Sequence, residues 1–389
     1  MLRAMRTPKI LRCLSFVSAG LFCAGFAGCG GSAKSTNTTK TTAQWVADGP
    51  MSIGLTTFTF VDNSRPTPAN GTYAGAPNRT LVTQVWYPTA QVGGSETDAP
   101  LAPGHYPLVI HSHGFMDSND GESYLGEHLA SYGYIVAAPD FPLSQANAPG
   151  NPTIDDTANQ PLDDTFVIDQ LLTTSGPTAA IAASIDPDRI VASGLSLGGL
   201  TTLLLGYHPT MRDPRLKAAL AMAPPSCMFT AEYFANAPAL PLLMMYGSSD
   251  AIVDPVANEQ RIFPFTKSPS ELMAFAAGSH TGFATAAAFL DAATNYDAFG
   301  CKALGMLDAS SFSTLGTAAQ GIAQDPSVCP AACTTIPTTP SLDAGRQQDL
   351  TKAAAQAFFD NALGRNTTGK QFVQSGIASE NMEVSVQLR

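Results

Sequence analysis

The sequence predicts an α/β fold in which a mostly parallel central sheet is flanked by helices. Two observations carry this prediction. Apolar runs of strand length alternate with helical stretches, and the run at residues 189–193 leads into a Gly-x-Ser-x-Gly turn at 194–198. Ser196 lies at the centre of this turn, and the apolar residues 200–207 follow it. A serine between two glycines, after a strand and before a helix, is typical of a nucleophile raised to the top of a sheet.

The remaining elements follow in chain order. Apolar runs predict strands over residues 52–61, 80–87, 133–138, 217–222, 240–246 and 271–275, and one more strand that begins at residue 107. Helices are expected over residues 122–132, 163–173 and 345–363, and Gly364 ends the last one. This order of elements contains no internal repeat.

A serine nucleophile needs a base and an acid that orients the base, and the chain supplies candidates for both. Asp250 follows an apolar run of strand length, and His280 follows the last expected core strand. Both therefore lie beyond the carboxyl ends of strands, where α/β sheets place their chemistry. The order Ser196, Asp250, His280 is that of the α/β-hydrolase fold. Asp254 is the alternative acid, and the alternative role for Asp250 is capping a turn.

The loop after the strand that begins at residue 107 is the expected source of the oxyanion hole. One donor is usually the N–H of the residue after the nucleophile, and a second comes from this earlier loop. We assign them to Leu197 and Phe115, with Met116 as the alternative to Phe115. His111 and His113 could suit a metal, but no Cys, Asp or Glu follows at ligand spacing. We therefore expect both histidines to brace the loop.

Several of these segments resemble a known group of proteins. Residues 52–88, the Ser-His-Gly-Phe loop at 112–115 and the turn at 194–199 look like bacterial platelet-activating-factor-acetylhydrolase-like and dienelactone-hydrolase-like proteins. The resemblance covers roughly residues 50–290. It implies an esterase of the α/β-hydrolase superfamily.

The two remaining triad segments add a second resemblance. The residues around Asp250 and His280 are similar to those of bacterial cutinase-like polyester hydrolases. One departure concerns the acid. The eukaryotic acetylhydrolases take it after the preceding strand, and the corresponding residues 221–226 of this chain contain no acid. The resemblance therefore supports ester hydrolysis more directly than it supports a phospholipid substrate.

The amino terminus has the pattern of an export signal. Basic residues precede a mostly apolar stretch over residues 14–27, which is too short for a membrane span. We expect residues 1–28 to be a signal peptide. Residues 26–29 resemble a lipobox, so Cys29 is the expected lipid-bearing residue of an envelope-anchored protein, with plain secretion as the alternative. The polar residues 29–48 are expected to form a flexible tether.

The expected catalytic domain spans residues 49–389 and carries its own cysteines. The four outside the signal and the anchor position are Cys227, Cys301, Cys329 and Cys333. An even number in an exported protein indicates two disulfides, with three possible pairings. Because Cys329 and Cys333 are close in sequence, we expect them to have different partners and to fix an insertion at about residues 295–342.

Charge and composition limit the kinds of ligand that this chain could bind. The chain has 31 acidic and 20 basic residues, and removal of the four basic residues of the signal would leave 16 basic residues and a charge of about −15. Basic residues do not cluster, which argues against nucleic acid as a ligand. The expected partner is a small or polymeric ester, the expected membrane attachment is the lipid, and the expected oligomeric state is a monomer.

Together these features predict an exported serine carboxylesterase. Ser196 would attack the ester carbonyl, His280 would accept the serine proton, and Asp250 would orient His280. No cofactor or metal is expected. The alternatives are a polyester hydrolase, a phospholipid acetylhydrolase and, from another class, a catalytically silent surface lipoprotein that binds its ligand without cleaving it.

Loops at 115–124, 141–161 and 295–342 are expected to rim the site and set its specificity. About seventeen residues separate the strands at 217–222 and 240–246, which is too few for a lipase-type cap. We therefore expect an open, shallow cleft that favours short to medium acyl chains.

Overall fold

Ten strands join into one sheet in the part of the chain that the computed structural model describes, residues 40–90, 95–290, 295–304 and 314–389. Their order across the sheet is β10-β9-β8-β7-β6-β4-β5-β2-β1-β3. The strands are β1 Ser52–Asp62, β2 Arg79–Thr89, β3 Ser95–Thr97, β4 Tyr106–Ser112, β5 Ile135–Pro139, β6 Ile185–Leu195, β7 Leu216–Met222, β8 Leu242–Gly247, β9 Ser270–Phe275 and β10 Val384–Leu388.

The centre of this sheet is parallel. Strands β5, β4, β6, β7, β8 and β9 pair with one another in the parallel sense, whereas β2 is antiparallel to β5, β1 to β2, and β10 to β9. Parallel strands end at the same edge of a sheet, so the loops after β4, β6, β8 and β9 meet there. The predicted mostly parallel sheet is confirmed.

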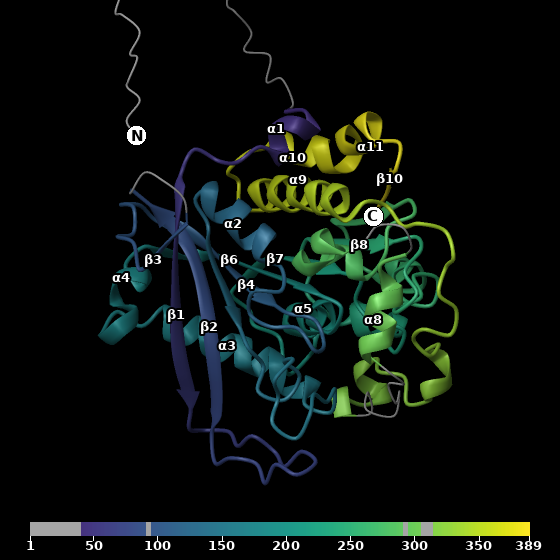
Figure 1. Ribbon diagram of the computed structural model, residues 1–389, viewed down its shortest axis with the longest axis horizontal. Helices are drawn as coiled ribbons and strands as arrows, with labels where there is room; N and C mark the ends of the chain where they lie inside the picture. The colour runs from purple at the N-terminus through teal and green to yellow at the C-terminus, as the bar shows by residue number, and fades with distance from the viewer. Residues whose placement is uncertain (1–39, 91–94, 291–294, 305–313) are drawn as a thin grey trace, which may run out of the picture. The chain divides into compact units, whose positions relative to one another are not determined.

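Helices cover both faces of the sheet (Figure 1). They are α1 Thr42–Val46, α2 Ser123–Ser131, α3 Gln160–Leu171, α4 Ala179–Ala182, α5 Leu197–Tyr207, α6 Ala231–Ala235, α7 Glu259–Ile262, α8 Asp297–Leu304, α9 Ala344–Ala362, α10 Thr368–Gln371 and α11 Ile377–Glu380. Side chains of α2 and α9 form one apolar core and those of α3 and α5 the other. Side chains along each strand point alternately into the two cores. In β4, for example, Leu108 and Ile110 face one core and Val109 faces the other.

The expected strands and helices are present, with shifts of a few residues at their ends. The largest shift among the helices is at α3, which begins at Gln160 instead of residue 163. Pro161 lies in its first turn, where a missing N–H costs nothing and the fixed φ suits the helix. Helix α6, which lies between β7 and β8 in sequence, packs Tyr233 and Phe234 into the core. This connection is therefore part of the core and does not form a lipase-type cap over the site.

The prediction of a flexible tether over residues 29–48 is wrong for its carboxyl-terminal end, where residues 42–46 form helix α1. Thr41 caps helix α1, and Trp45 of this helix is fully buried against Phe372 at 5.5 Å between ring centroids. The Thr42 N–H also donates to Glu380 at 2.6 Å. A buried tryptophan gains enough from leaving water to fix a short segment that polar composition alone would leave free. The expected signal at 1–28 and Cys29 lie outside the described residues.

Strand β10 has no counterpart among the sequence-based expectations. It pairs with β9, with Val384 opposite Phe275, and makes β9 an inner strand. His280 therefore follows the last parallel strand but not the last strand of the sheet. Only five residues long and mostly exposed, β10 lacks the apolar run by which the other strands are predicted.

Candidate active site

Ser196 lies in a strained turn between β6 and α5. Its backbone has φ 56° and ψ −119°, a conformation that costs a non-glycine residue about 1–3 kcal/mol. A Cβ at Gly194 would lie 2.2 Å from the carbonyl oxygen of Gly198, and a Cβ at Gly198 would lie 1.9 Å from that of Ser112. The two glycines are therefore required by the close approach of β4, β6 and α5, as the sequence motif predicts.

The proposed oxyanion donors converge on this serine from two elements. Leu197 is the first residue of α5, so its N–H has no acceptor within the helix. Gly114 lies next to the serine, since a Cβ there would be 3.6 Å from the Cβ of Ser196. The Met116 N–H already donates to Ser144 O at 2.8 Å. This contact leaves Phe115 as the better second donor.

Gln160 connects these two elements, a link that the sequence does not suggest. Its Nε2 donates to Ser144 Oγ at 2.8 Å, and its Oε1 accepts from the Thr201 hydroxyl. On one side, Ser144 O accepts a hydrogen bond from the Met116 N–H. On the other side, the Thr201 hydroxyl also lies within hydrogen-bond distance of Leu197 O, at 3.0 Å. The fully buried Gln160 thus joins the Phe115 loop to the first turn of α5.

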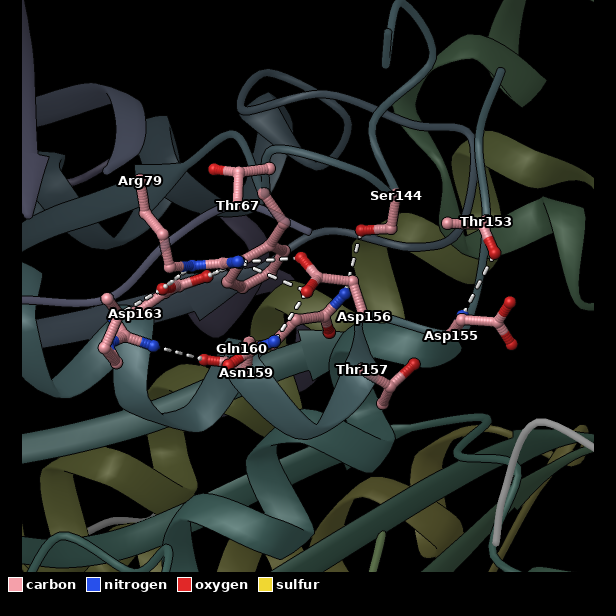
Figure 2. A network of polar contacts seen from close by, with 12 residues as sticks. Thr67, Arg79, Ser144, Thr153, Asp155, Asp156, Thr157, Asn159, Gln160 and Asp163 are labelled. Carbon is pink, nitrogen blue, oxygen red and sulfur yellow. Dashed lines mark hydrogen bonds and ion pairs between the residues drawn. The ribbon is translucent and has the colours of Figure 1, made fainter. Parts of the chain in front are cut away.

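A buried ion-pair network fixes the segment that carries Gln160. Figure 2 shows Arg79 between Asp156 and Asp163, on either side of Gln160 in sequence. The Arg79 guanidinium donates to Asp163 at 2.6 Å and to Asp156 at 2.7 Å, and all three side chains are excluded from water. Removal of Arg79 would leave the buried Asp156 carboxylate without a cation, at a cost of about 3–5 kcal/mol. The network therefore anchors the start of α3 to β2.

The two histidines of the β4 loop are structural, as expected. The Phe141 N–H donates to His113 Nε2 at 3.1 Å, and His113 Nδ1 donates to Gly114 O at 2.7 Å. His111 lies between Ser193 Oγ at 2.8 Å and Glu122 Oε2 at 2.9 Å. Burial lowers the pKa of both histidines to about 4, so both are neutral near pH 7.

Asp250 and His280, on the loops after β8 and β9, form a buried pair. His280 Nδ1 lies 2.8 Å from Asp250 Oδ2, and Asp250 Oδ1 accepts the N–H groups of Ile252 and Val253. The rival Asp254 instead accepts the N–H groups of two residues in its own turn and makes no contact of this kind with His280 within the described chain. The geometry therefore favours Asp250 as the orienting acid.

The environment of His280 favours its protonated form. Burial alone would lower its pKa, but the facing carboxylate of Asp250, with Asp297 and Glu122, outweighs burial and raises the pKa above 6.5. Burial and neighbouring carboxylates also raise the pKa of Glu122 and of Asp117 to about 8. Perturbed groups of this kind cluster at functional sites.

Ser196 and His280 line one cavity of about 310 Å³. They share no hydrogen bond among the described residues, a contact that often tightens only when substrate binds. All three expected specificity loops contribute to the lining, which includes Phe115, Met116, Asp117, Ile154, Phe299, Gly300, Ala303, Leu304, Cys329, Pro330, Ala331 and Ala332. The insertion supplies eight of the 26 lining residues, so it forms a substantial part of the cavity wall.

One disulfide ties the insertion to the rest of the fold, and a second lies within the insertion. Cys227 pairs with Cys329, and Cys301 pairs with Cys333. Cys329 and Cys333 thus have different partners. The first bridge joins the loop after β7 to Cys329, which lines the cavity. The second joins α8 to Cys333, which directly follows the lining residues 330–332. The lining segment 329–332 is therefore fixed by a disulfide at each end.

The described residues contain neither a group of three or more side chains suited to a metal nor a helix long and apolar enough to cross a membrane.

A search of solved structures finds this architecture in a ferulic acid esterase from Streptomyces cinnamoneus. The match has a TM-score of 0.59 at 23% identity and covers 88% of this chain and 98% of the esterase. With the sheet order, the strained serine turn and the order of the three candidate residues, it settles the fold. The chain is an α/β hydrolase by fold.

Sequence comparisons agree with that fold. Residues 97–224 match the family model described as chlorophyllase, a span that holds the Phe115 loop and Ser196 but ends before Asp250. Among curated proteins, the chain is 29% identical to cutinase est2 of Thermobifida alba and 27% identical to cutinase 2 of Thermobifida cellulosilytica, each over 132 residues. These matches cover 34% of this chain and 39% and 45% of the two cutinases. The expected similarity to cutinases is confirmed, over 132 residues.

Proposed function

We propose that this protein is a serine hydrolase that cleaves carboxylic esters. The observation that carries the proposal is the meeting of Ser196, in its strained turn, with the buried His280–Asp250 pair at one cavity. Cutinases among the relatives and an esterase among the structural matches support the same reaction class. The chain spans about two-fifths of the length of the cutinases it matches, so the activity rests on the site itself.

The proposed reaction passes through an acyl-enzyme. Ser196 Oγ attacks the ester carbonyl carbon while His280 Nε2 accepts the hydroxyl proton, and the N–H groups of Phe115 and Leu197 stabilise the oxyanion. His280 then returns the proton to the leaving alcohol, and Asp250 stabilises the charged imidazole. Water, activated by His280, hydrolyses the acyl-enzyme and restores Ser196.

The cavity favours a neutral, apolar substrate. Its wall is mainly aliphatic and aromatic, and the acidic side chains of its described lining are those of Asp117 and Asp254. The described lining contains no lysine or arginine to pair with an anionic phosphate, which disfavours phospholipids. A cavity of about 310 Å³ suits short to medium acyl chains. A polyester is the second candidate, favoured by the cutinase similarity and by Phe299, which is 56% exposed where it borders the cavity.

The disulfides also support the proposed location. Two bridges in one domain are typical of proteins that fold in an oxidising compartment, so we place this enzyme outside the cytoplasm. Attachment through a lipid on Cys29 remains part of the proposal. Mass spectrometry of the amino-terminal peptide from a membrane fraction would detect this lipid.

One labelling experiment tests the reaction class. A fluorophosphonate probe should modify Ser196 of the full chain, identified by peptide mapping, and pretreatment with the probe should abolish hydrolysis of p-nitrophenyl butyrate. A matched panel from acetate to laurate, with a short-chain phospholipid and a polyester film, then ranks the substrates. A folded protein that is neither labelled nor active on any of these esters would support a silent binding protein instead.

A further inference from the structure

Asp297 lies in the insertion, 17 positions after His280, and its carboxylate contacts both loops that carry the acid–base pair. Oδ2 accepts the Ala251 N–H at 2.8 Å and the His280 N–H at 3.1 Å, and Oδ1 accepts the Thr281 N–H at 2.7 Å. The Asp297 side chain is fully buried. Three backbone donors on one carboxylate form charge-assisted hydrogen bonds, which are about twice as strong as neutral ones.

We propose that Asp297 is a positioning residue for the catalytic pair, because it ties the Asp250 loop to the His280 loop. The inference rests on the proposed function, since it gives the bonded loops a catalytic role. Ala251 follows Asp250 directly, and the other two donors belong to His280 itself and to the next residue. The carboxylate therefore fixes backbone at both ends of the His280–Asp250 hydrogen bond.

Neighbouring contacts show that the insertion is built to hold this carboxylate. The Asp297 N–H donates to Asn295 Oδ1 at 2.9 Å, and Asn295 Nδ2 donates to Ser249 O at 3.2 Å. The Cys333 N–H donates to Ala251 O at 2.8 Å. The residues on both sides of Asp250 are thus hydrogen-bonded to the insertion, so the insertion orients the triad as well as lining the cavity.

The charge of Asp297 adds a second effect that a purely structural residue would lack. The titratable groups that face His280 are Asp250 on the β8 loop, Asp297 at the start of α8 and Glu122 before α2. A negative charge on any of these groups favours the imidazolium and so raises the pKa of His280. Loss of the Asp297 charge should therefore lower this pKa, and the acidic limb of the kcat/KM profile should move to lower pH.

The test compares D297N with D186N in the full-length enzyme, with p-nitrophenyl butyrate as substrate. Asp186 also accepts a backbone N–H, from Asp188 at 3.0 Å, but it lies at the start of β6, at the end away from Ser196. We expect D297N to lower kcat by about 10–100-fold with KM nearly unchanged, because misplacement of a catalytic group costs up to about 10²-fold. D186N should match the wild type. Circular dichroism and thermal melting check that each variant is folded.

A titration that needs no turnover provides the deciding readout. In an S196A background, the pKa of His280 is measured by NMR from its imidazole protons, assigned with H280Q. We expect D297N to lower this pKa by about 0.5–1 unit, the low end for a neighbouring charge. If D297N does not fold, D297E serves: it keeps the charge but moves the carboxylate, so kcat should fall while the pKa stays close to that of the wild type.

An unchanged His280 pKa and a wild-type kcat in folded D297N would overturn the inference. So would a loss of activity fully explained by unfolding, with the pKa of His280 unmoved in the folded fraction. Failure of the wider proposal looks different, because an unlabelled wild-type enzyme without esterase activity would reject the reaction class before any Asp297 variant is compared.

Discussion

The nucleophile half of the candidate site and its acid–base half are held in place by different means. Ser196 and its proposed oxyanion donors are fixed by the packing of β4, β6 and α5, where glycines permit backbone contacts that no other residue allows. Asp250 and His280 lie on loops whose geometry depends on hydrogen bonds to the insertion. The first half is part of the core, whereas the second depends on a segment fixed by disulfides.

This difference predicts how the two halves respond to substitution. Changes in the nucleophile half should reduce the chemical step directly or disturb the core. Changes in the contacts that surround the acid–base pair should be graded, because several hydrogen bonds share the task of holding the pair.

The largest effect is expected for Ser196→Ala. Removal of the nucleophile leaves only binding and the oxyanion donors, so kcat should fall by about 10⁶ while the fold is kept. The measurement is p-nitrophenyl butyrate hydrolysis by a preparation free of other esterases, with circular dichroism as the folding control. Residual turnover above a few per cent of the wild-type value would place the nucleophile elsewhere.

Asp250→Asn should have the next largest effect and tests the acid–base half. Asparagine keeps the size of the side chain but cannot stabilise the imidazolium or enforce its tautomer, and kcat should fall by about 10⁴. Asp254→Asn is the matched control, because Asp254 also lines the cavity but bonds only within its own turn. A larger loss in the Asp254 variant would show that the acid has been misassigned.

The same division explains how much could be predicted from the sequence. The Ser196 turn, the Phe115 loop and the strands that carry them follow from local patterns, because glycine spacing and apolar runs report backbone geometry directly. Asp250 and His280 could be found from chain order and their places after strands. These residues could be proposed from the sequence because their places depend on the regular sheet.

Gln160 and Asp297 could not be predicted, because their roles depend on contacts between segments that are distant in sequence. Gln160 contacts a residue 41 positions away and Asp297 one 46 positions away. No local pattern marks either side chain. Helix α1 was missed for a related reason, since the burial of Trp45 depends on Phe372 at the other end of the chain.

Gln160→Met tests whether the nucleophile half also has a positioning residue. Methionine fills a similar volume but loses the bonds to Ser144 and Thr201, so the Phe115 loop should shift relative to α5. Loss of one oxyanion donor costs about 10²–10³ in kcat, and a displaced donor should cost less, about 10–100-fold, with KM unchanged. Gln170→Met on the same helix is the control. A rise in KM without a fall in kcat would assign Gln160 to substrate binding instead.

The two disulfides should differ in the kinetic constant that they affect. Closure of 32- and 102-residue separations contributes about 3–5 kcal/mol to the free energy of unfolding in each case. The Cys301→Ser/Cys333→Ser double variant should lower kcat a few-fold, because the Cys333 N–H holds Ala251 beside Asp250. The Cys227→Ser/Cys329→Ser variant should mainly raise KM, because these two residues line the cavity. Urea unfolding and steady-state kinetics on both variants measure the two effects. Equal changes in KM and kcat for both would remove the distinction.

The smallest expected effect concerns Glu122, which precedes α2 and is one of the groups that face His280. His280 must be neutral to accept the serine proton, and its raised pKa places the acidic limb of kcat/KM above pH 6.5. Burial raises the pKa of Glu122 to about 8, so this group gains its charge as the pH rises and then further favours the imidazolium. Glu122→Gln removes that charge and should move the limb to lower pH by a fraction of a unit, with little change in the pH-independent kcat.

Glu127→Gln is the control for this variant. Glu127 is on α2 but is not among the groups that face His280, so this change should leave the acidic limb where it is. A limb that stays fixed in Glu122→Gln, or moves to higher pH, would show that the two halves of the site titrate independently and are coupled only through substrate.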